Sequence, residues 1–227
     1  MTSSSVARSK LRLVTSDPAP PSRAALETTE GDDFELLAAV RGGDPASARS
    51  LYQRLQPVVS RTASKLLGFS DRDLDDVVQT TMIEIITSIG RFRGESSLAS
   101  WASTIAAHVV FKHIRRRGTE RRIFGDAAVE FLSSAASVSG DPARLARLRQ
   151  SVAAVGECLR QIDPLKTWTF LLHDVCGYDL REVAEITEVS IAAAQTRLVR
   201  GRREVHERIA KRPDLAQALE ELEGEHT

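Results

Sequence analysis

Apolar side chains between residues 74 and 109 recur with the period of an α-helix. Two stripes repeat every third or fourth residue, the first at Leu74, Val78, Met82, Ile85 and Ile89 and the second at Leu98, Trp101, Ile105 and Val109. Such spacing places each stripe on one helical face. We predict two helices that pack on each other through these stripes, with Trp101 in the core.

Capping residues predict where helices begin. Asp44-Pro45 and Asp163-Pro164 each place a carboxylate before a proline at the first helical position. Ser96 or Ser97 is expected to cap the helix that carries the second stripe.

The chain divides into five segments by composition and periodicity. Aromatic residues are 5% of the 227 residues, which favours helices over sheet. We expect an all-α protein of two small helical domains joined by a flexible linker. The expected segments are a disordered extension at 1–31, helical domains at 32–118 and 144–212, a linker at 119–143 and an acidic tail at 213–227.

Residues 179–203 have the pattern of a helix-turn-helix. Asp179 with Glu182 forms a capping box, and Ser190 is placed to cap a second helix. Ala184 is small enough for two helices to cross closely. Glu188 stands in the turn, where glycine is usual. A structural helical hairpin has the same pattern, but the arginines that follow and the short exposed side chains favour DNA binding.

Charge is distributed unevenly although the formal net charge is zero. Residues 105–122 hold six basic side chains and one acid, and 195–212 hold seven basic side chains and two acids. The tail holds five acids and no Lys or Arg. Two basic patches indicate a protein that meets phosphate groups in two places.

The sequence contains little that would indicate a secreted protein, a membrane protein, a metalloprotein or an enzyme. Cys158 and Cys176 form no disulfide framework, no apolar run approaches the length of a membrane span, and no secretory signal is present, so we expect a cytoplasmic protein without direct membrane insertion. His173 and Cys176 lack the further ligands of a zinc site. With no phosphate loop or nucleophile motif, we expect no metal, no cofactor and no enzymatic activity.

Three passages resemble a family of known proteins. They are Asp73-Leu74-Asp75-Asp76-Val77-Val78-Gln79, Phe92-Arg93-Gly94-Glu95-Ser96-Ser97 with Trp101 and Ile105-Ala106, and Gly177 to Ala184 continuing to Arg197-Leu198. Over about residues 32–210, their order resembles that of bacterial RNA polymerase sigma factors of the extracytoplasmic-function (ECF) class in the sigma-seventy family. The resemblance implies that 32–118 is sigma region 2 and 144–212 is sigma region 4.

The resemblance also implies partners and site residues. Core RNA polymerase would be bound at its largest-subunit clamp and the flap of its second subunit, with the clamp contacted by Asp75, Asp76, Gln79 and Thr80. Region 2 would bind and melt the promoter −10 element through Phe92, Arg93, Ser96, His108, Lys112, Arg115 and Arg116. Region 4 would bind the −35 element through Gln195, Thr196, Arg197, Val199, Arg200 and Arg203. An anti-sigma protein is a further expected partner.

Three positions depart from the family pattern. His108 stands where the family usually has Asn, Gln195 replaces a usual Arg or Lys, and Thr80 replaces a usual acid. An amide at Gln195 favours adenine through a paired hydrogen bond. We therefore expect promoter preferences that differ from those of relatives, and somewhat weaker core binding.

The alternative class is a helix-turn-helix repressor or activator that binds duplex DNA independently of polymerase. Such a protein usually binds as a dimer to half-sites about one helical turn apart. The 73–117 block argues against it, because the block resembles a polymerase-binding and melting module rather than a ligand pocket. Co-migration with core polymerase distinguishes the two classes.

Overall fold

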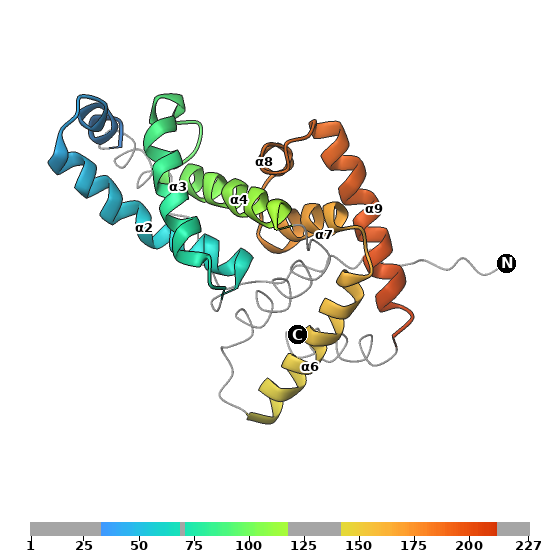
Figure 1. Cartoon of the computed structure of the whole chain (residues 1–227). Helices are drawn as coiled ribbons and strands as arrows, with labels where there is room; N and C mark the ends of the chain where they lie inside the picture. Colours follow the sequence, from blue (N-terminus) through green and yellow to red (C-terminus); the bar gives the residue numbers. More distant parts are fainter. Residues whose placement is uncertain (1–32, 69–70, 118–141, 213–227) are drawn as a thin grey trace, which may run out of the picture.

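The computed structural model describes residues 33–68, 71–117 and 142–212, and these ranges contain helices and no strand. The described helices are residues 33–41, α2 (Pro45–Leu67), α3 (Leu74–Ser88), the short η1 (Ile89–Arg91), α4 (Leu98–Arg116), α6 (Pro142–Arg160), α7 (Pro164–Phe170), the π-helical turn η2 (Leu171–Val175), α8 (Leu180–Ile186) and α9 (Ile191–Ile209) (Figure 1). The all-α prediction is confirmed. The expected extension at 1–31, most of the linker and the tail at 213–227 lie outside the described residues.

The predicted caps begin five helices. Asp44 accepts hydrogen bonds from two backbone N–H groups at the start of α2, and Asp163 accepts one at the start of α7. Ser97, not Ser96, caps α4. Asp179 and Glu182 form the predicted capping box of α8, and the hydroxyl of Ser190 accepts from the backbone of α9. Local sequence therefore sets these boundaries.

The N-terminal half, residues 33–117, has its own apolar core. Helix 33–41, α2, α3 and α4 meet there, and the two predicted stripes contact each other through Met82, Ile85, Ile89, Leu98 and their partly buried neighbours. Trp101 packs against this core, as predicted, with its ring 5.4 Å from that of Phe92.

The C-terminal half, residues 142–212, is organised by a close crossing of α7 and α9. Gly201 of α9 lies at this crossing, and a Cβ atom there would be 3.0 Å from the carbonyl oxygen of Lys166. Leu159, Ile162, Leu171 and Val205 form a small core beneath the crossing. The absence of a side chain at Gly201 therefore lets α9 approach α7 this closely.

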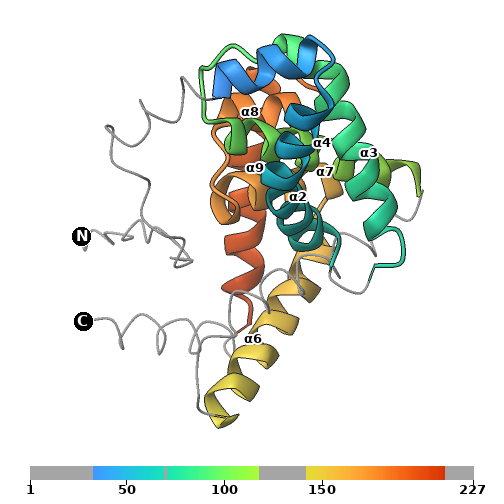
Figure 2. The same ribbon diagram turned by 90° about the vertical axis from the view of Figure 1, so that its left-hand side faces the viewer.

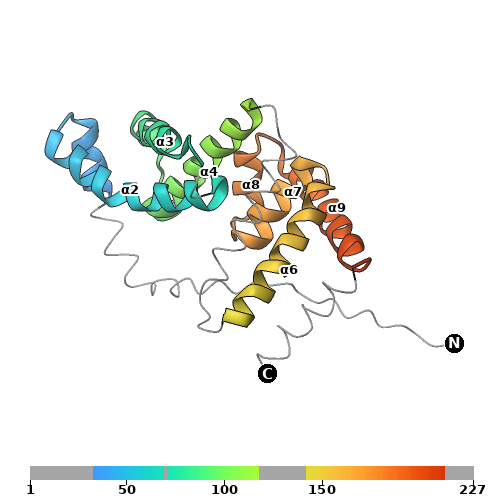
Figure 3. The same ribbon diagram turned by 60° about the horizontal axis from the view of Figure 1, so that its bottom comes forward.

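The two halves are not separate, because a third apolar core joins them. Phe111 and Ile114 of α4 share this core with Trp168, Leu172 and Ile186 of the C-terminal half. The rings of Phe111 and Trp168 meet edge to face at 6.0 Å. Figures 1 and 3 both show α4 between α3 and the C-terminal helices. Besides the linker that the sequence predicts, this core joins the two halves, and we call the result the closed arrangement.

The shape of the molecule leaves α6 projecting away from this packed body. Figure 2 shows α6 extending below the helices that surround α4, beside the end of α9. Cys158, Leu159 and Ile162 at and just beyond the end of α6 are buried. The last turn of α6 is therefore what attaches this helix to the rest of the C-terminal half.

Candidate polymerase and nucleic-acid interfaces

The polar face of α3 is exposed along its length. Asp75, Asp76, Gln79 and Thr80 all lie on the surface, as the sequence predicts for the polymerase contact. Two apolar side chains that the sequence analysis missed continue this face, because Ile83 and Ile86 are 57% and 45% exposed. Since they lie off the predicted core stripe at Met82 and Ile85, their spacing could have indicated a second apolar surface.

The loop at residues 92–97 carries two of its predicted DNA-binding side chains outward. Arg93 is exposed, with its guanidinium 3.8 Å from Glu95, and Ser96 is exposed as well. Gly94 has a φ of +74°, and a Cβ there would lie 2.6 Å from the ring of Phe34. Glycine is therefore required for this loop to pass over the helix at 33–41.

Phe92 does not fit the predicted role of a base-stacking residue. Its side chain is 7% exposed and packs between the rings of Phe34 and Trp101, with centroids 5.8 and 5.4 Å away. The expectation that Phe92 contacts DNA is corrected here: its ring belongs to the core and fixes the start of the loop. Burial of an aromatic ring is favourable enough to override an exposed stacking role.

Three of the predicted −10 residues on α4 converge on one carboxylate. His108, Lys112 and Arg115 approach Glu188 of the C-terminal half at 3.2, 4.0 and 3.1 Å. The hydrogen bond with His108 and the charges of Lys112 and Arg115 lower the pKa of Glu188 below its usual value. Arg116 is exposed, with no ion pair among the described residues. We call these four residues of α4 the basic cluster.

The last residues of this basic region are structural. Arg117 binds Asp71 at 2.7 Å and lies 3.5 Å from Asp73, which is also 3.3 Å from His113. Burial acts to raise the pKa of Asp71, but the Asp73 backbone N–H and Arg117 together hold it below its usual value. These contacts attach the turn before α3 to the end of α4.

The second helix of the helix-turn-helix exposes a continuous face. Ala194 and Leu198 are buried, as predicted, and Val199 is 59% exposed. The exposed side chains follow helical spacing on one side of α9, which we call the recognition face: Ala192, Gln195, Thr196, Val199, Arg200 and Arg203. Figure 1 shows α9 along the edge of the molecule, away from α4.

Not every arginine of α9 belongs to this face. Arg197 is half-buried, and one terminal guanidinium nitrogen is buried with no hydrogen-bond partner in the described part of the chain. Arg202 donates two hydrogen bonds to Asp174 of η2, at 2.7 and 2.5 Å. This pairing raises the pKa of Arg202 and holds α9 on the preceding turn. Arg200 makes no comparable contact within the described ranges, while Arg203 lies 3.6 Å from Glu207.

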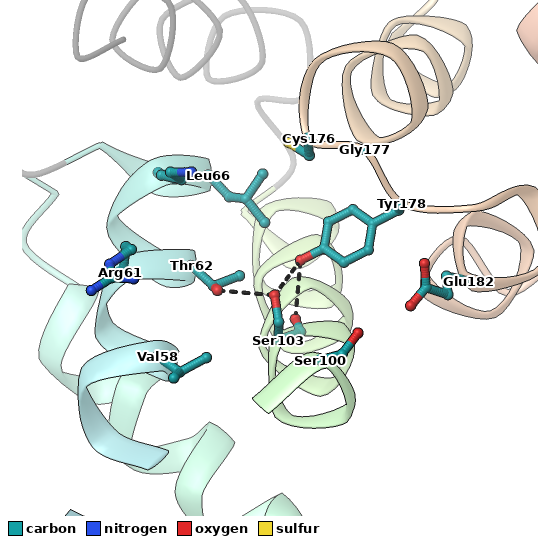
Figure 4. Close-up of a pocket in the computed structure, with 11 residues that line it drawn as sticks. Val58, Arg61, Thr62, Leu66, Ser100, Ser103, Cys176, Gly177, Tyr178 and Glu182 are labelled. Atoms are coloured by element: carbon teal, nitrogen blue, oxygen red, sulfur yellow. Dashed lines mark hydrogen bonds between the residues drawn. The ribbon is translucent and has the colours of Figure 1, made fainter. Parts of the chain in front are cut away.

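A polar pocket of about 280 Å³ lies between the two halves, a feature that the sequence did not indicate. Figure 4 shows Tyr178 pointing at Ser103 of α4, with a hydroxyl–hydroxyl distance of 2.7 Å. Burial raises the pKa of Tyr178 above its usual value, and it raises the pKa of the neighbouring Cys176 thiol to about 12. Thr104 of α4 also donates to Glu182 at 3.3 Å. Hydrogen bonds thus add to the apolar contact between the halves.

The described ranges contain neither a membrane-spanning helix nor a group of metal ligands. None of their helices has the length and apolar character to cross a bilayer. The same residues bring together no group of three His, Cys, Asp or Glu side chains that could hold a metal ion.

The fold and these surfaces define a class of protein: an all-α DNA-binding protein whose helix-turn-helix follows an N-terminal helical module with its own exposed face. Comparisons with known proteins make the class specific. Residues 51–120 match the family described as Sigma-70 region 2, and residues 153–205 match the family described as Sigma-70, region 4.

Relatives of known name agree with both matches. The ECF RNA polymerase sigma factor SigC of Mycobacterium tuberculosis is 28% identical, over 78% of this chain and 92% of the relative. The ECF RNA polymerase sigma-E factor of Haemophilus influenzae is 25% identical, over 78% of this chain and 95% of the relative. A solved structure of the sigma factor RpoE from Bartonella quintana, in complex with the anti-sigma factor NepR, covers 71% of this chain and 96% of its own at 20% identity and a TM-score of 0.43.

The chain belongs to the sigma-70 family and, within it, to the ECF sigma factors. It is therefore a transcription initiation factor, as the sequence resemblance predicted.

Proposed function

We propose that this sigma factor binds core RNA polymerase mainly through α3, melts and holds the −10 element with the N-terminal half, and reads the −35 element with α9. Region 2 then corresponds to residues 32–118 and region 4 to residues 144–212. The observation that carries the proposal is the recognition face, because it combines small side chains, an amide and two arginines on one exposed side of a helix that follows a helix-turn.

The −35 assignment rests on the chemistry of that face. Gln195 can pair with adenine through its amide, and Arg200 can donate two hydrogen bonds to guanine or to phosphate. The exposed Val199 side chain is suited to contact a thymine methyl group. Thr196 contributes a hydroxyl that already donates to Ala192 and is left to accept. Arg203 extends the contact along the DNA backbone, and the half-buried Arg197 is the remaining residue proposed to contact the −35 element.

The −10 assignment combines the exposed loop with the basic cluster. Single-stranded DNA is bound by basic grooves that follow its backbone. Arg93 and Ser96 precede α4, whereas Lys112, Arg115 and Arg116 lie near its other end, roughly 25 Å away at the helical rise of 1.5 Å per residue. His108 lies between them, where its imidazole can bind a base edge.

The polymerase assignment rests on the mixed face of α3. Asp75, Asp76, Gln79 and Thr80 supply polar contacts, while Ile83 and Ile86 supply apolar area that a monomer gains nothing by exposing. Apolar anchors within a polar rim are typical of protein–protein interfaces. The clamp of the polymerase largest subunit is the proposed partner of this face, and the flap of the second subunit that of region 4.

The remaining expectations follow from this role. The protein acts without catalysing a reaction of its own, in the cytoplasm, and is controlled by an anti-sigma protein. The solved relative RpoE is itself in complex with the anti-sigma factor NepR. These statements are proposals for this chain.

Gel filtration with core polymerase and run-off transcription on genomic fragments test the proposal. We expect co-migration with core and defined start sites. Asp76→Ala and Ile83→Ala should each lower core affinity, and their combination should lower it most, while Glu35→Ala, an exposed acid on another helix, should leave it unchanged. A protein that never co-migrates with core, yet binds duplex promoter DNA alone at nanomolar concentration, is the independent repressor or activator instead.

A further inference from the structure

The closed arrangement is unable to contact both promoter elements, an argument that rests on the proposed function. α8 packs against α4 on one side and α9 on the other, so the two DNA-binding helices are separated by about 20 Å at usual interhelical distances. The −10 and −35 elements lie about 25 base pairs apart, or about 85 Å along duplex DNA. The halves must therefore separate before the protein grips a promoter.

Glu188 has a backbone conformation that a glutamate adopts only at a cost. Its φ is +55°, and it is the one residue other than glycine with a positive φ in the described ranges. Glycine adopts this conformation without strain and is the usual residue at this turn. Backbone strain that persists at one residue points to a function of its side chain.

The helix-turn-helix itself does not need the Glu188 side chain. α8 is capped by Asp179 and Glu182, and α9 is capped by Ser190. The side-chain contacts of Glu188 are all with the other half of the molecule, at His108, Lys112 and Arg115. His108 departs from the family pattern and Glu188 from the usual helix-turn-helix pattern, and here the two side chains contact each other.

The carboxylate of Glu188 occupies the place that a DNA phosphate would take if it bound both Lys112 and Arg115. Lys112 and Arg115 are cations that would neutralise the backbone of single-stranded DNA, and the carboxylate of Glu188 lies 4.0 and 3.1 Å from them. While these contacts persist, the two side chains are not free to bind DNA. Arg116 and the recognition face remain exposed in the same arrangement.

We propose that Glu188 is an autoinhibitory latch. It places a carboxylate on the basic cluster of α4 in place of a DNA phosphate, and it stabilises the closed arrangement at the rim of the apolar contact between the halves. DNA or a partner that takes Lys112 and Arg115 from Glu188 thereby favours separation of the halves.

The test compares Glu188→Gln with the matched control Glu185→Gln. Glu185 is an exposed acid on α8 with no ion pair within the described residues, so both variants lose one negative charge from nearly the same place. Glu188→Gly is the second variant, because glycine removes the strain together with the side chain and so keeps the turn intact.

Two measurements on the full chain report on the two parts of the proposal. The rate at which Cys176 reacts with Ellman's reagent reports on opening, because this thiol lines the pocket between the halves, while Cys158, which is 4% exposed in the C-terminal half, is an internal reference. Fluorescence anisotropy with a fluorescein-labelled oligothymidylate reports on access to the basic cluster, since backbone contacts require no particular sequence.

We expect both latch variants to raise the Cys176 rate and the affinity for oligothymidylate by about threefold to tenfold, the effect of losing one to three exposed ion pairs. Glu185→Gln should change the Cys176 rate and the oligothymidylate affinity only by the small, general effect of removing one negative charge. Increasing salt should raise the Cys176 rate of the unaltered protein more than that of Glu188→Gln, because salt screens the latch.

The outcomes separate the latch from the proposed function. An unchanged Cys176 rate in both variants overturns the latch, and the −10 assignment still stands if Arg115→Gln lowers DNA affinity in the Glu188→Gln background. A raised Cys176 rate with unchanged DNA affinity overturns the masking of the basic cluster. If Arg115→Gln and Arg116→Gln also leave DNA affinity unchanged in that background, the −10 assignment itself fails.

Discussion

The two proposed DNA-binding surfaces of this sigma factor differ in how accessible they are. The recognition face of α9 lies on the outside of the molecule, and Val199 is 59% exposed. The basic cluster of α4 lies beside the C-terminal half, where three of its four residues contact Glu188. Basic residues therefore do not become a usable DNA surface by their number alone. Their partners in the fold decide it, and here one half of the protein covers the surface of the other.

The difference between the two surfaces has separable causes. The apolar core around Phe111 and Trp168 brings the halves together. Glu188 then uses that proximity to occupy the cations of α4. The first cause should be strong and insensitive to salt, and the second weak and sensitive to salt. The predictions below vary them one at a time.

Removing the Trp168 ring should have the largest effect. Trp168 is 2% exposed and packs on Phe111 across the contact between the halves. We expect Trp168→Ala to lower the free energy of unfolding by about 3–5 kcal/mol and to expose the basic cluster. Urea unfolding followed by circular dichroism measures the loss.

Trp101 makes the outcome specific to one half. It becomes the only tryptophan in this variant, and it packs against the core of the N-terminal half. We expect its fluorescence to report a separate transition that is less affected than that of the C-terminal half. Equal destabilisation of both halves would show that they unfold as one unit.

Gly201→Ala should lower the affinity of the recognition face for duplex DNA without exposing the basic cluster. The added Cβ would lie 3.0 Å from the backbone oxygen of Lys166, so α9 must move away from α7. Overpacking of this kind typically costs about 1–3 kcal/mol. Thermal unfolding measures that cost, and duplex DNA binding measures the displacement of α9.

Gly90→Ala provides the matched control for this substitution. No atom lies within 4 Å of a Cβ at Gly90, and its φ is not positive. We expect it to be neutral or slightly stabilising, because alanine restricts the unfolded chain. Similar losses in both variants would mean that close packing at Gly201 is unimportant.

Much of this fold could be predicted from local patterns. The caps at Asp44, Asp163, Asp179 and Ser190 and the two apolar stripes are short-range signals, and the structure confirms them. The contact between the halves was missed, although α4 carries a second apolar stripe at Ala107, Val110, Phe111 and Ile114. An apolar stripe indicates that a helical face is buried, but it does not indicate which residues cover it. Here the covering residue Trp168 lies more than fifty residues away in the sequence.

The candidate site shows the same limit. Phe92 was expected at the DNA because an aromatic side chain serves equally in a core or in base stacking, and only its neighbours decide. Glu188 was noticed as an unusual turn residue, but its function depends on side chains 73 to 80 residues earlier in the sequence. Pairings at that range require the folded chain.

Arg200→Ala and Arg202→Ala should separate DNA binding from structure within α9. Arg200 is exposed on the recognition face, so its loss should lower affinity for duplex promoter DNA about fivefold to tenfold and reduce the salt dependence of binding. Arg202 is held by Asp174 in a paired hydrogen bond, so its loss should lower stability before it affects DNA contacts. Salt-dependent anisotropy and thermal unfolding distinguish the two.

Either of two results would contradict this division of roles. One is an Arg200→Ala variant that binds core polymerase as poorly as it binds DNA, which would indicate misfolding. The other is an Arg202→Ala variant that keeps its melting temperature and loses DNA affinity, which would place Arg202 on the recognition face.

The smallest effect should distinguish two neighbouring arginines of α4. Arg116 is exposed and has no ion pair in the described part of the chain, whereas Arg115 is held by Glu188 at 3.1 Å. In the unaltered protein, Arg116→Gln should therefore lower oligothymidylate affinity about twofold to threefold, and Arg115→Gln should have little effect. With Glu188→Gln present, the two losses should become equal, because Arg115 is then available to phosphate. Anisotropy on the unaltered protein, Arg115→Gln, Glu188→Gln and their combination forms a double-mutant cycle whose coupling measures how far Glu188 withholds Arg115 from DNA. A coupling of zero would mean that the closed arrangement leaves the basic cluster as accessible as the recognition face, and the contrast between the two surfaces would then lie in position alone.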